Sequence, residues 1–269
     1  MKTGYFLPCV LAAAASQLCM SAAAAADFAV SISPPRFELQ VKPAEKSRQI
    51  IEITNAANQA SSFKVKTADW SLAADGSVTF QDDLAPQSCR PWVVLERREL
   101  VVPAKRPYRF RFEITPPPDT PAMECRFALL IEGEDQTANT GSLAIPYSGR
   151  FGVIVYAAVG DVAPKIELLG ATVQTINGRP TAVLKVKNSG TAHGRLEGFM
   201  TGIDALGTSL EIAATPLPIL PGGTANIALI ATRPGDPDTA VQVQFPLTVK
   251  GKLEWGNNQS QLIEQRFSQ

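Results

Sequence analysis

The residues best suited to chemistry with another molecule lie in an extended run near the middle of the chain. Leu143, Ile145 and Tyr147 alternate with smaller or polar residues, which is typical of a β-strand with two distinct faces. Pro146 cannot donate a main-chain hydrogen bond, so one edge of this strand is expected to be open. An open apolar edge promotes aggregation unless it is reserved for a partner chain. The run therefore predicts a strand that is lent to another protein, and Arg150, on its second face, could fix the register of that partner.

Each of these residues also has a simpler interpretation. Alternation alone does not distinguish a lent strand from one whose apolar side chains face the core of their own domain. Arg150 could merely blunt an exposed edge strand. Arg36, which follows the Pro34-Pro35 break, could be an ordinary surface arginine.

Thiol and imidazole groups, the usual carriers of covalent and metal chemistry, are scarce in this chain. Of the four cysteines, two lie in the N-terminal apolar segment, which leaves Cys89 and Cys125. A pair of this kind in an exported protein predicts a disulfide, with two buried free thiols as the alternative. His193, the single histidine, lies in a turn of small residues and is expected to be exposed to solvent. These counts argue against a histidine-dependent hydrolase and against a structural metal site.

The N-terminal segment has the layout of a secretory signal peptide over residues 1–26. Lys2 supplies the positive charge, an apolar stretch follows, and a run of alanines precedes the expected cleavage before Asp27. A retained membrane anchor is the alternative. No later segment is long and apolar enough to cross a bilayer, so no membrane insertion is expected after cleavage.

Composition and turn signals predict an all-β protein of two domains. The 21 prolines and 19 glycines divide the chain into many short segments, and the 25 basic and 25 acidic residues show no basic excess of the kind that nucleic-acid binding requires. Tyr108, Phe110 and Phe112 alternate and are expected to face a core. Residues 132–140 are expected to form a polar loop. A short hinge at residues 160–164 separates a first β-sandwich, 27–160, from a second, 161–269.

The order and spacing of several short segments resemble those of the periplasmic pilus-assembly chaperones, a family with two immunoglobulin-like domains. The first domain resembles the family in its opening strand, which ends at Arg36, and in its tryptophan and Leu-Val-Val-Pro segments. The second domain resembles it in its Asn-x-Gly turn. The segments that carry the resemblance are residues 28–36, 92–94, 99–103, 187–190 and 195–198.

The resemblance implies a periplasmic protein that acts by donor-strand complementation. Leu143, Ile145 and Tyr147 would fill the groove of a pilin-like subunit that lacks a strand, and the complex would then meet an outer-membrane usher. Arg36 and Arg150 would anchor the C-terminal carboxylate of the subunit, since charge-assisted hydrogen bonds to a carboxylate are strong. No cofactor, metal ion or nucleic acid would be needed, and no catalytic residue is expected.

Two positions depart from the family pattern. Gly152 stands where the family has a lysine, and Tyr156 stands close to the position of a family arginine. The contacts that the second domain makes are therefore expected to differ. An exported structural or adhesive β-sandwich protein remains the alternative function.

Overall fold

The computed structural model describes residues 30–268 except 74–75, 87, 135, 141–142, 148 and 257, and it describes no side chains over residues 136–140 and 143–147. The signal peptide predicted over residues 1–26 lies outside the described residues. Two immunoglobulin-like β-sandwiches follow one another along the chain, and the described helical residues amount to one short 3₁₀ turn, η1 (Arg90–Trp92). Within the described ranges, no helix has the length and apolar character that a membrane span requires.

The first domain contains two packed sheets. One has the strand order β1-β3-β8-β6, and the other β2-β12-β9-β4-β5 with β7 joined to β4. The strands of the first sheet are β1 (Val30–Ser33), β3 (Ser47–Asn55), β8 (Arg106–Ile114) and β6 (Val93–Leu95). Those of the second are β2 (Arg36–Val41), β12 (Arg150–Val159), β9 (Met123–Gly133), β4 (Ser61–Leu72), β5 (Val78–Gln81) and β7 (Glu99–Val102).

The opening segment of the chain contributes to both sheets of the first domain. β1 pairs with β3 in the first sheet, and after the Pro34-Pro35 break β2 runs parallel to β12 in the second. Proline cannot continue a ladder, so the break releases the chain from one sheet to the other. The consequence for the site is that Arg36 becomes the first residue of an edge strand.

The predicted core stripe on β8 is confirmed. Phe110 and Phe112 are buried between the sheets, while Tyr108 packs at the margin of the same cluster. The disulfide between Cys89 and Cys125 is also present, with the two Cα atoms 6.1 Å apart. It joins the residue before η1 to β9 and lies within the core.

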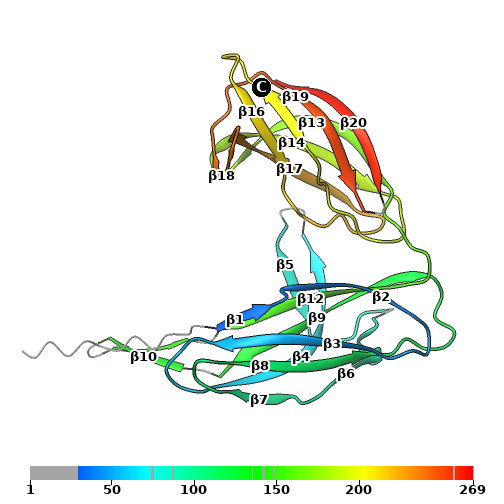
Figure 1. Ribbon diagram of the computed structural model, residues 1–269, viewed down its shortest axis with the longest axis vertical. Coiled ribbons are helices and arrows are strands. Elements are labelled where there is room, and N and C mark those ends of the chain that lie inside the picture. Colours follow the sequence, from blue (N-terminus) through cyan, green and yellow to red (C-terminus); the bar gives the residue numbers. More distant parts are fainter. Residues whose placement is uncertain are drawn as a thin grey trace, which may run out of the picture.

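The expected polar loop at residues 132–140 is partly wrong. β9 extends to Gly133, and β10 (Gln136–Thr140) pairs with β11 (Leu143–Tyr147) as an antiparallel hairpin. The polar composition of β10 gave no strand signal in the sequence, because its pairing with β11 is made by the main chain and does not depend on an apolar face. β10 lies at the end of the first domain opposite to the connection with the second domain (Figure 1).

The second domain is a sandwich in which one strand belongs to both sheets. β17 pairs with β14 through Thr224–Ala228 and with β16 from Leu229 onward. The full order is β13-β14-β17-β16-β15-β19-β20, with β18 joined to β17. The strands are β13 (Ile166–Ile176), β14 (Arg179–Asn188), β15 (Met200–Ile203), β16 (Ser209–Ala214), β17 (Thr224–Arg233), β18 (Asp236–Ala240), β19 (Leu247–Trp255) and β20 (Gln259–Phe267).

A third, smaller cluster joins the two domains. The β4–β5 hairpin rises from the first domain toward the second (Figure 1). Trp70 and Tyr156 are buried on the outer face of the second sheet of the first domain, and Leu220 of the second domain packs against their cluster. The outer face of this sheet is therefore the floor of the space between the domains.

Candidate partner-binding cleft

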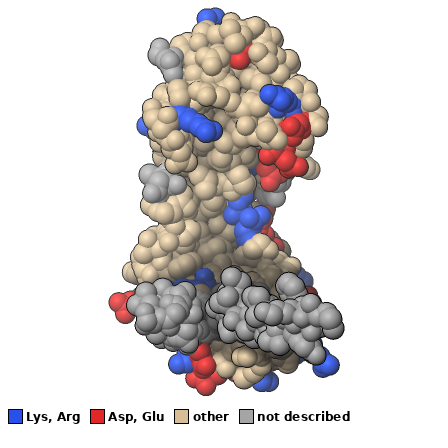
Figure 2. Space-filling view, turned by 90° about the vertical axis from the view of Figure 1, so that its left-hand side faces the viewer, with Lys and Arg blue, Asp and Glu red and all other residues tan. Residues whose placement is uncertain are grey.

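The cleft floor is formed by alternate residues of β2, β12, β9 and β4. The register places Arg36 beside Ile154 and Glu38 beside Tyr156, so all four side chains lie on the same face. A cavity of about 370 Å³ opens where this floor meets the second domain, and its lining includes Arg36, Glu38, Tyr156, His193 and Arg195. Figure 2 shows basic and acidic side chains gathered at the waist between the two domains.

Arg36 projects from the first position of β2 into this cleft. Its side chain is 46% exposed, and its Nε lies 2.8 Å from Oε1 of Glu38. Glu38 is two residues further along the same face of the strand. The predicted anchor residue is therefore accessible, and it already has an anionic partner within the chain.

Arg150 lies on the same face of the sheet, at the start of β12. Its side chain is 57% exposed, and its Nε lies 2.7 Å from Oε1 of Glu132 on β9. Because Arg36 is level with Ile154, four residues further along β12, the two arginines are separated by about 13 Å along the strand. The structure does not bring them into contact.

The backbone of the predicted donor strand is described, and its side chains lie outside the described residues. β11 contains Leu143, Ile145 and Tyr147, and it pairs with β10 from Thr140↔Leu143 to Gln136↔Tyr147. These two strands form a separate two-stranded sheet. Within the part of the chain that the structure describes, no other strand pairs with β11.

The ring of Phe80 fills the space above Gly152, where the resemblance would place a lysine. A β-carbon built on Gly152 would have three atoms of that ring within 3.2 Å. Phe80 belongs to β5 and reaches this position because the β4–β5 hairpin folds over the sheet. A longer side chain at position 152 would have to displace the ring.

We expect the substitution Gly152→Ala to destabilise the first domain by about 1–3 kcal/mol, the usual cost of overpacking. In a protein that already carries Phe80→Ala, the Gly152→Ala substitution should cause no further loss of stability. A double-mutant cycle measured by urea denaturation should therefore show strong coupling between the two positions. Gly170→Ala is the control, since nothing lies within 4 Å of a β-carbon there. Equal costs in the two backgrounds would contradict the steric account.

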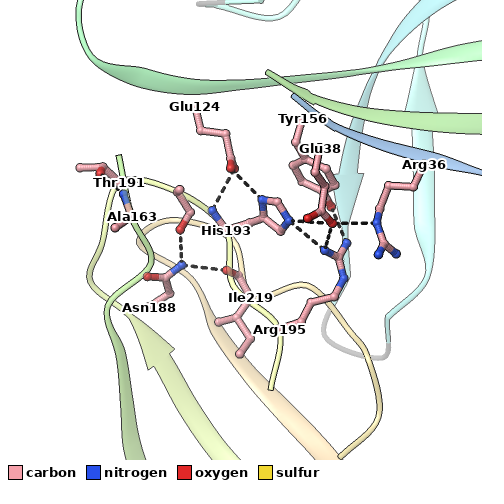
Figure 3. A network of polar contacts seen from close by, with 11 residues as sticks. Arg36, Glu38, Glu124, Tyr156, Ala163, Asn188, Thr191, His193, Arg195 and Ile219 are labelled. Atoms are coloured by element: carbon pink, nitrogen blue, oxygen red, sulfur yellow. Dashed lines mark hydrogen bonds and ion pairs between the residues drawn. The ribbon is translucent and has the colours of Figure 1, made fainter. Parts of the chain in front are cut away.

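His193 does not lie exposed in a turn, and that expectation is wrong. Its side chain is 7% exposed and contacts the first domain. The backbone N–H of His193 donates to Oε1 of Glu124 at 2.9 Å, and Nδ1 lies 2.7 Å from Oε2. The ring stacks on Tyr156 with centroids 3.6 Å apart (Figure 3). The histidine therefore fastens the second domain to β9 and β12.

Arg195, two residues further along the chain, makes a second contact between the domains. Its Nη1 donates to Oε1 of Glu38 at 2.7 Å and to Nε2 of His193 at 2.8 Å (Figure 3). Because Nε2 accepts, the ring hydrogen of His193 lies on Nδ1 and is donated to Glu124. Arg195 thus shares Glu38 with Arg36, so the predicted anchor residue is coupled to the contact between the domains.

The electrostatics of this network stabilise an ionised Glu38 and a neutral Tyr156. Partial burial opposes ionisation of Glu38, but the guanidinium groups of Arg195 and Arg36 outweigh it and hold the pKa of this carboxyl below its ordinary value. Burial raises the pKa of Tyr156 to about 12, although the Arg195 guanidinium opposes this. The phenol is therefore protonated throughout the neutral range.

We expect the alkaline stability of the protein to depend on Tyr156. In the unfolded chain its phenol ionises near the reference pKa of 10.0, whereas in the folded protein it keeps the proton up to about 12. The stability is fully present below pH 10 and is lost as the pH rises through this interval, by about 2–3 kcal/mol in total. Urea denaturation at pH 9 and pH 11.5 should show the decline.

The Tyr156→Phe variant should remove most of this decline, because phenylalanine does not ionise. Tyr108→Phe is the matched control, since Tyr108 is partly exposed and donates to Glu96 at the protein surface. That variant should keep the decline. An unchanged pH profile in Tyr156→Phe would contradict the assignment.

Sequence reasoning missed the carboxylates and the histidine of this network. One signal was available: Arg36 and Glu38 have the spacing of two that places them on one face of a strand. The contacts of Glu124 with His193, 69 residues apart, have no such local signal. Among the described residues, no cluster of three or more His, Cys, Asp or Glu side chains has the arrangement of a metal site.

Comparison with known proteins finds similarity at the level of structure. No family model matches the chain, and no curated protein matches its sequence. Solved structures similar to it include fimbrial chaperones, the class that the sequence resembles. The class 5 fimbriae chaperone CfaA has 13% identity and a TM-score of 0.46, with 90% of this chain and 100% of that chain covered.

Two further structures are similar to the same degree. The E. coli chaperone DraB has 14% identity and a TM-score of 0.46, over 88% of this chain and 98% of that chain. A chain of the Salmonella enterica complex of SafA pilin with the SafB chaperone has 13% identity and a TM-score of 0.46, over 89% of this chain and 96% of that chain.

Proposed function

We propose that this protein is a periplasmic chaperone that binds, folds and caps pilus or fimbrial subunits by donor-strand complementation and delivers them to an outer-membrane usher. The observation that carries the proposal is the β10–β11 hairpin. β11 continues toward β12 and pairs with β10 alone among the described strands. One edge of β11 is therefore available for the main chain of another protein.

The residues assigned from the sequence have defined tasks in this mechanism. Main-chain hydrogen bonds from β11 would provide affinity, and Leu143, Ile145 and Tyr147 would enter the groove of the subunit at every second position. Arg36 and Arg150 are proposed to contact the terminal carboxylate of the subunit. Each would exchange its present partner within the chain, Glu38 or Glu132, for that terminal carboxylate.

The proposal requires no catalytic residue, nucleotide or metal ion, because folding of the subunit supplies the free energy for its later transfer. It also takes residues 1–26 as a signal peptide that is removed on export. The mature protein then has domains at 27–160 and 161–269. The end of β12 at Val159 and the start of β13 at Ile166 agree with this division.

Co-expression with the product of a neighbouring gene that encodes a pilin-like chain tests the proposal. The subunit should survive in the periplasm and co-purify only when the chaperone is present. Ile145→Asp should abolish recovery, because it places a charge in an apolar groove. Arg36→Ala should reduce recovery, and Arg109→Ala, an exposed residue on β8, should not.

Recovery that is equal with and without the protein would reject the chaperone function. A stable, surface-attached protein that binds no incomplete subunit would instead support the adhesive or structural alternative.

A further inference from the structure

A cavity of about 570 Å³ opens at the side of the first β-sandwich. It lies between β6, an edge strand of the first sheet, and the middle of β4 in the second sheet. No described residue lines both this cavity and the cavity between the domains. β6 lies on the side of the first domain that faces away from the second domain (Figure 1). The side cavity is therefore a surface separate from the cleft.

The wall formed by β6 presents main-chain groups that the rest of the described chain does not use. Trp92 and Glu96, which flank β6, form main-chain hydrogen bonds on the side of β8. Because bonded and non-bonded residues alternate along an antiparallel pair, the main-chain groups of Val93 and Leu95 point away from β8. The Val93 N–H donates to the carbonyl oxygen of Arg90. The Val93 C=O and the N–H and C=O of Leu95 have no partner among the described residues.

The opposite wall is a gap in the edge of β4. On the side away from β9, β4 pairs with β7 over residues 61–64 and with β5 over residues 69–72. Arg90 occupies the interval between these pairings. Its Nη2 donates to the carbonyl oxygen of Thr67 at 2.8 Å, and its Nη1 lies 3.3 Å from Oδ2 of Asp69. The guanidinium group thus closes this part of the β4 edge, whereas the β6 edge stays open.

The lining of the side cavity is positively charged. Among the described residues around it, Lys66, Arg90 and Arg98 are cationic and Asp82 alone is acidic. Lys66 lies 3.1 Å from Asp82, and Arg90 contacts Asp69, so each of these cations has a counter-charge. Arg98 is exposed, and no described residue forms a hydrogen bond or an ion pair with its side chain. The cavity therefore places an unpaired cation beside an open strand edge.

The unused groups of β6 have the spacing that an added antiparallel strand requires. One residue of that strand, opposite Leu95, can accept from the Leu95 N–H and donate to its C=O. The residue opposite Val93 can donate to the Val93 C=O. Side chains of an added strand alternate between two faces, and on the outer face they would meet Val94, which is 60% exposed.

We propose that the β6 edge binds an extended, acidic segment of a partner protein by strand addition, with an aspartate or glutamate side chain of that segment held by Arg98. Charge decides between the possible occupants. Two copies of this edge would bring two Arg98 side chains together, which disfavours self-pairing, whereas an acidic segment is complementary to the lining. The proposal concerns a different surface from β11 and does not rest on the chaperone function.

A peptide panel tests the site in the full-length mature protein. The probe is acetyl-Thr-Val-Glu-Val-Glu-Val-Thr-amide. One control peptide has lysine in place of both glutamates, and another has every internal amide nitrogen methylated, so that it cannot donate to a strand edge. In NMR titrations, the acidic peptide should bind saturably and slow hydrogen exchange at the Leu95 amide. Exchange at the Val94 amide, on the β8 side, should stay as in the free protein. Neither control peptide should bind.

Charge reversal at Arg98 tests the ionic contact. Arg98→Glu should weaken binding of the acidic peptide about tenfold or more, and it should allow the lysine peptide to bind. The melting temperature should match that of the wild type, because the Arg98 side chain has no partner within the described chain. Arg109→Glu is the matched control: Arg109 is exposed on β8, and its substitution makes the same change in net charge without changing the preference between the peptides.

The possible results separate this site from the other open edge. Slower exchange at Leu95, together with a preference that reverses in Arg98→Glu, supports strand addition at β6. A peptide that binds while exchange at Leu95 is unchanged occupies another surface, such as the edge of β11, and overturns the inference. The absence of saturable binding, or equal binding of the acidic and lysine peptides, overturns it as well. None of these results changes the chaperone proposal, which depends on β11.

Discussion

Replacing both Cys89 and Cys125 by alanine is expected to lower the free energy of unfolding of the first domain by about 4 kcal/mol. The bond closes a loop with a sequence separation of 36. In the chain-entropy account, a cross-link of this span lowers the conformational entropy of the unfolded chain and so raises its free energy by about 4 kcal/mol. Both cysteines are buried, but each substitution removes a single sulfur atom, so the further packing loss is small beside the loss of the bond. Urea denaturation of the oxidised protein and of the double variant measures the difference.

Reduction provides the control for this prediction. Wild-type protein unfolded in dithiothreitol should match the double variant, and each single Cys→Ala variant should fall to the same level, because either removes the bond. A loss below about 1 kcal/mol in the double variant would show that the loop is constrained by other contacts.

The disulfide also matters for the cleft, because of the residues on either side of it. Cys125 lies on β9 between Glu124, which holds His193, and Arg126. At the other end of the bond, Arg90 donates to the carbonyl oxygens of Thr67 and Asp82 at 2.8 and 2.9 Å. The bond therefore ties the residues that face the second domain to the core, and its loss should weaken the contact between domains as well as the first domain.

Much of the fold could be predicted from local patterns. The alternation of Phe110 and Phe112 is a sufficient signal, because each apolar face of a strand must be buried against the opposite sheet. The position of Arg36 at the start of a strand followed from the Pro34-Pro35 break. Pairing of the two remaining cysteines followed from their number and from the expected export.

The cleft could not be predicted in the same way, because its contacts join residues that are distant in the sequence. The partner of Arg150, Glu132, is set by the register between β12 and β9, which the sequence does not show. The ring of Phe80 covers Gly152 only because a hairpin bends over the sheet. His193 was expected to be exposed because its own segment is a turn of small residues. The residues that bury it, Glu124 and Tyr156, belong to the first domain.

The buried Asn188 supports the segment that carries the domain contacts. It is the last residue of β14, and its side chain is fully buried. Its Nδ2 donates to the carbonyl oxygens of Ala192 and Ile219, both at 2.8 Å. Its Oδ1 accepts from the backbone N–H groups of Lys165 and Gly190 at 3.0 and 2.9 Å. One amide group thus satisfies four backbone groups from three separate segments.

Asn188→Ala is therefore expected to destabilise the second domain by about 3 kcal/mol or more, since each unpaired backbone group that stays buried costs about 1–3 kcal/mol. Asn188→Asp should be at least as destabilising, because it keeps the acceptor but places a buried carboxylate oxygen against the carbonyl oxygens of Ala192 and Ile219. Asn226→Ala on β17 is the matched control: Asn226 is exposed, and its substitution should change the stability by less than about 0.5 kcal/mol.

The same substitution should loosen the contact between the domains, because Ala192 immediately precedes His193. Hydrogen exchange at the His193 amide, which donates to Glu124 in the native protein, reports on this directly. Faster exchange in Asn188→Ala under conditions where the first domain remains folded would show that the amide positions His193. Unchanged exchange would mean that stacking on Tyr156 and the Glu124 carboxylate suffice to hold the histidine, and that Asn188 serves the stability of the second domain alone.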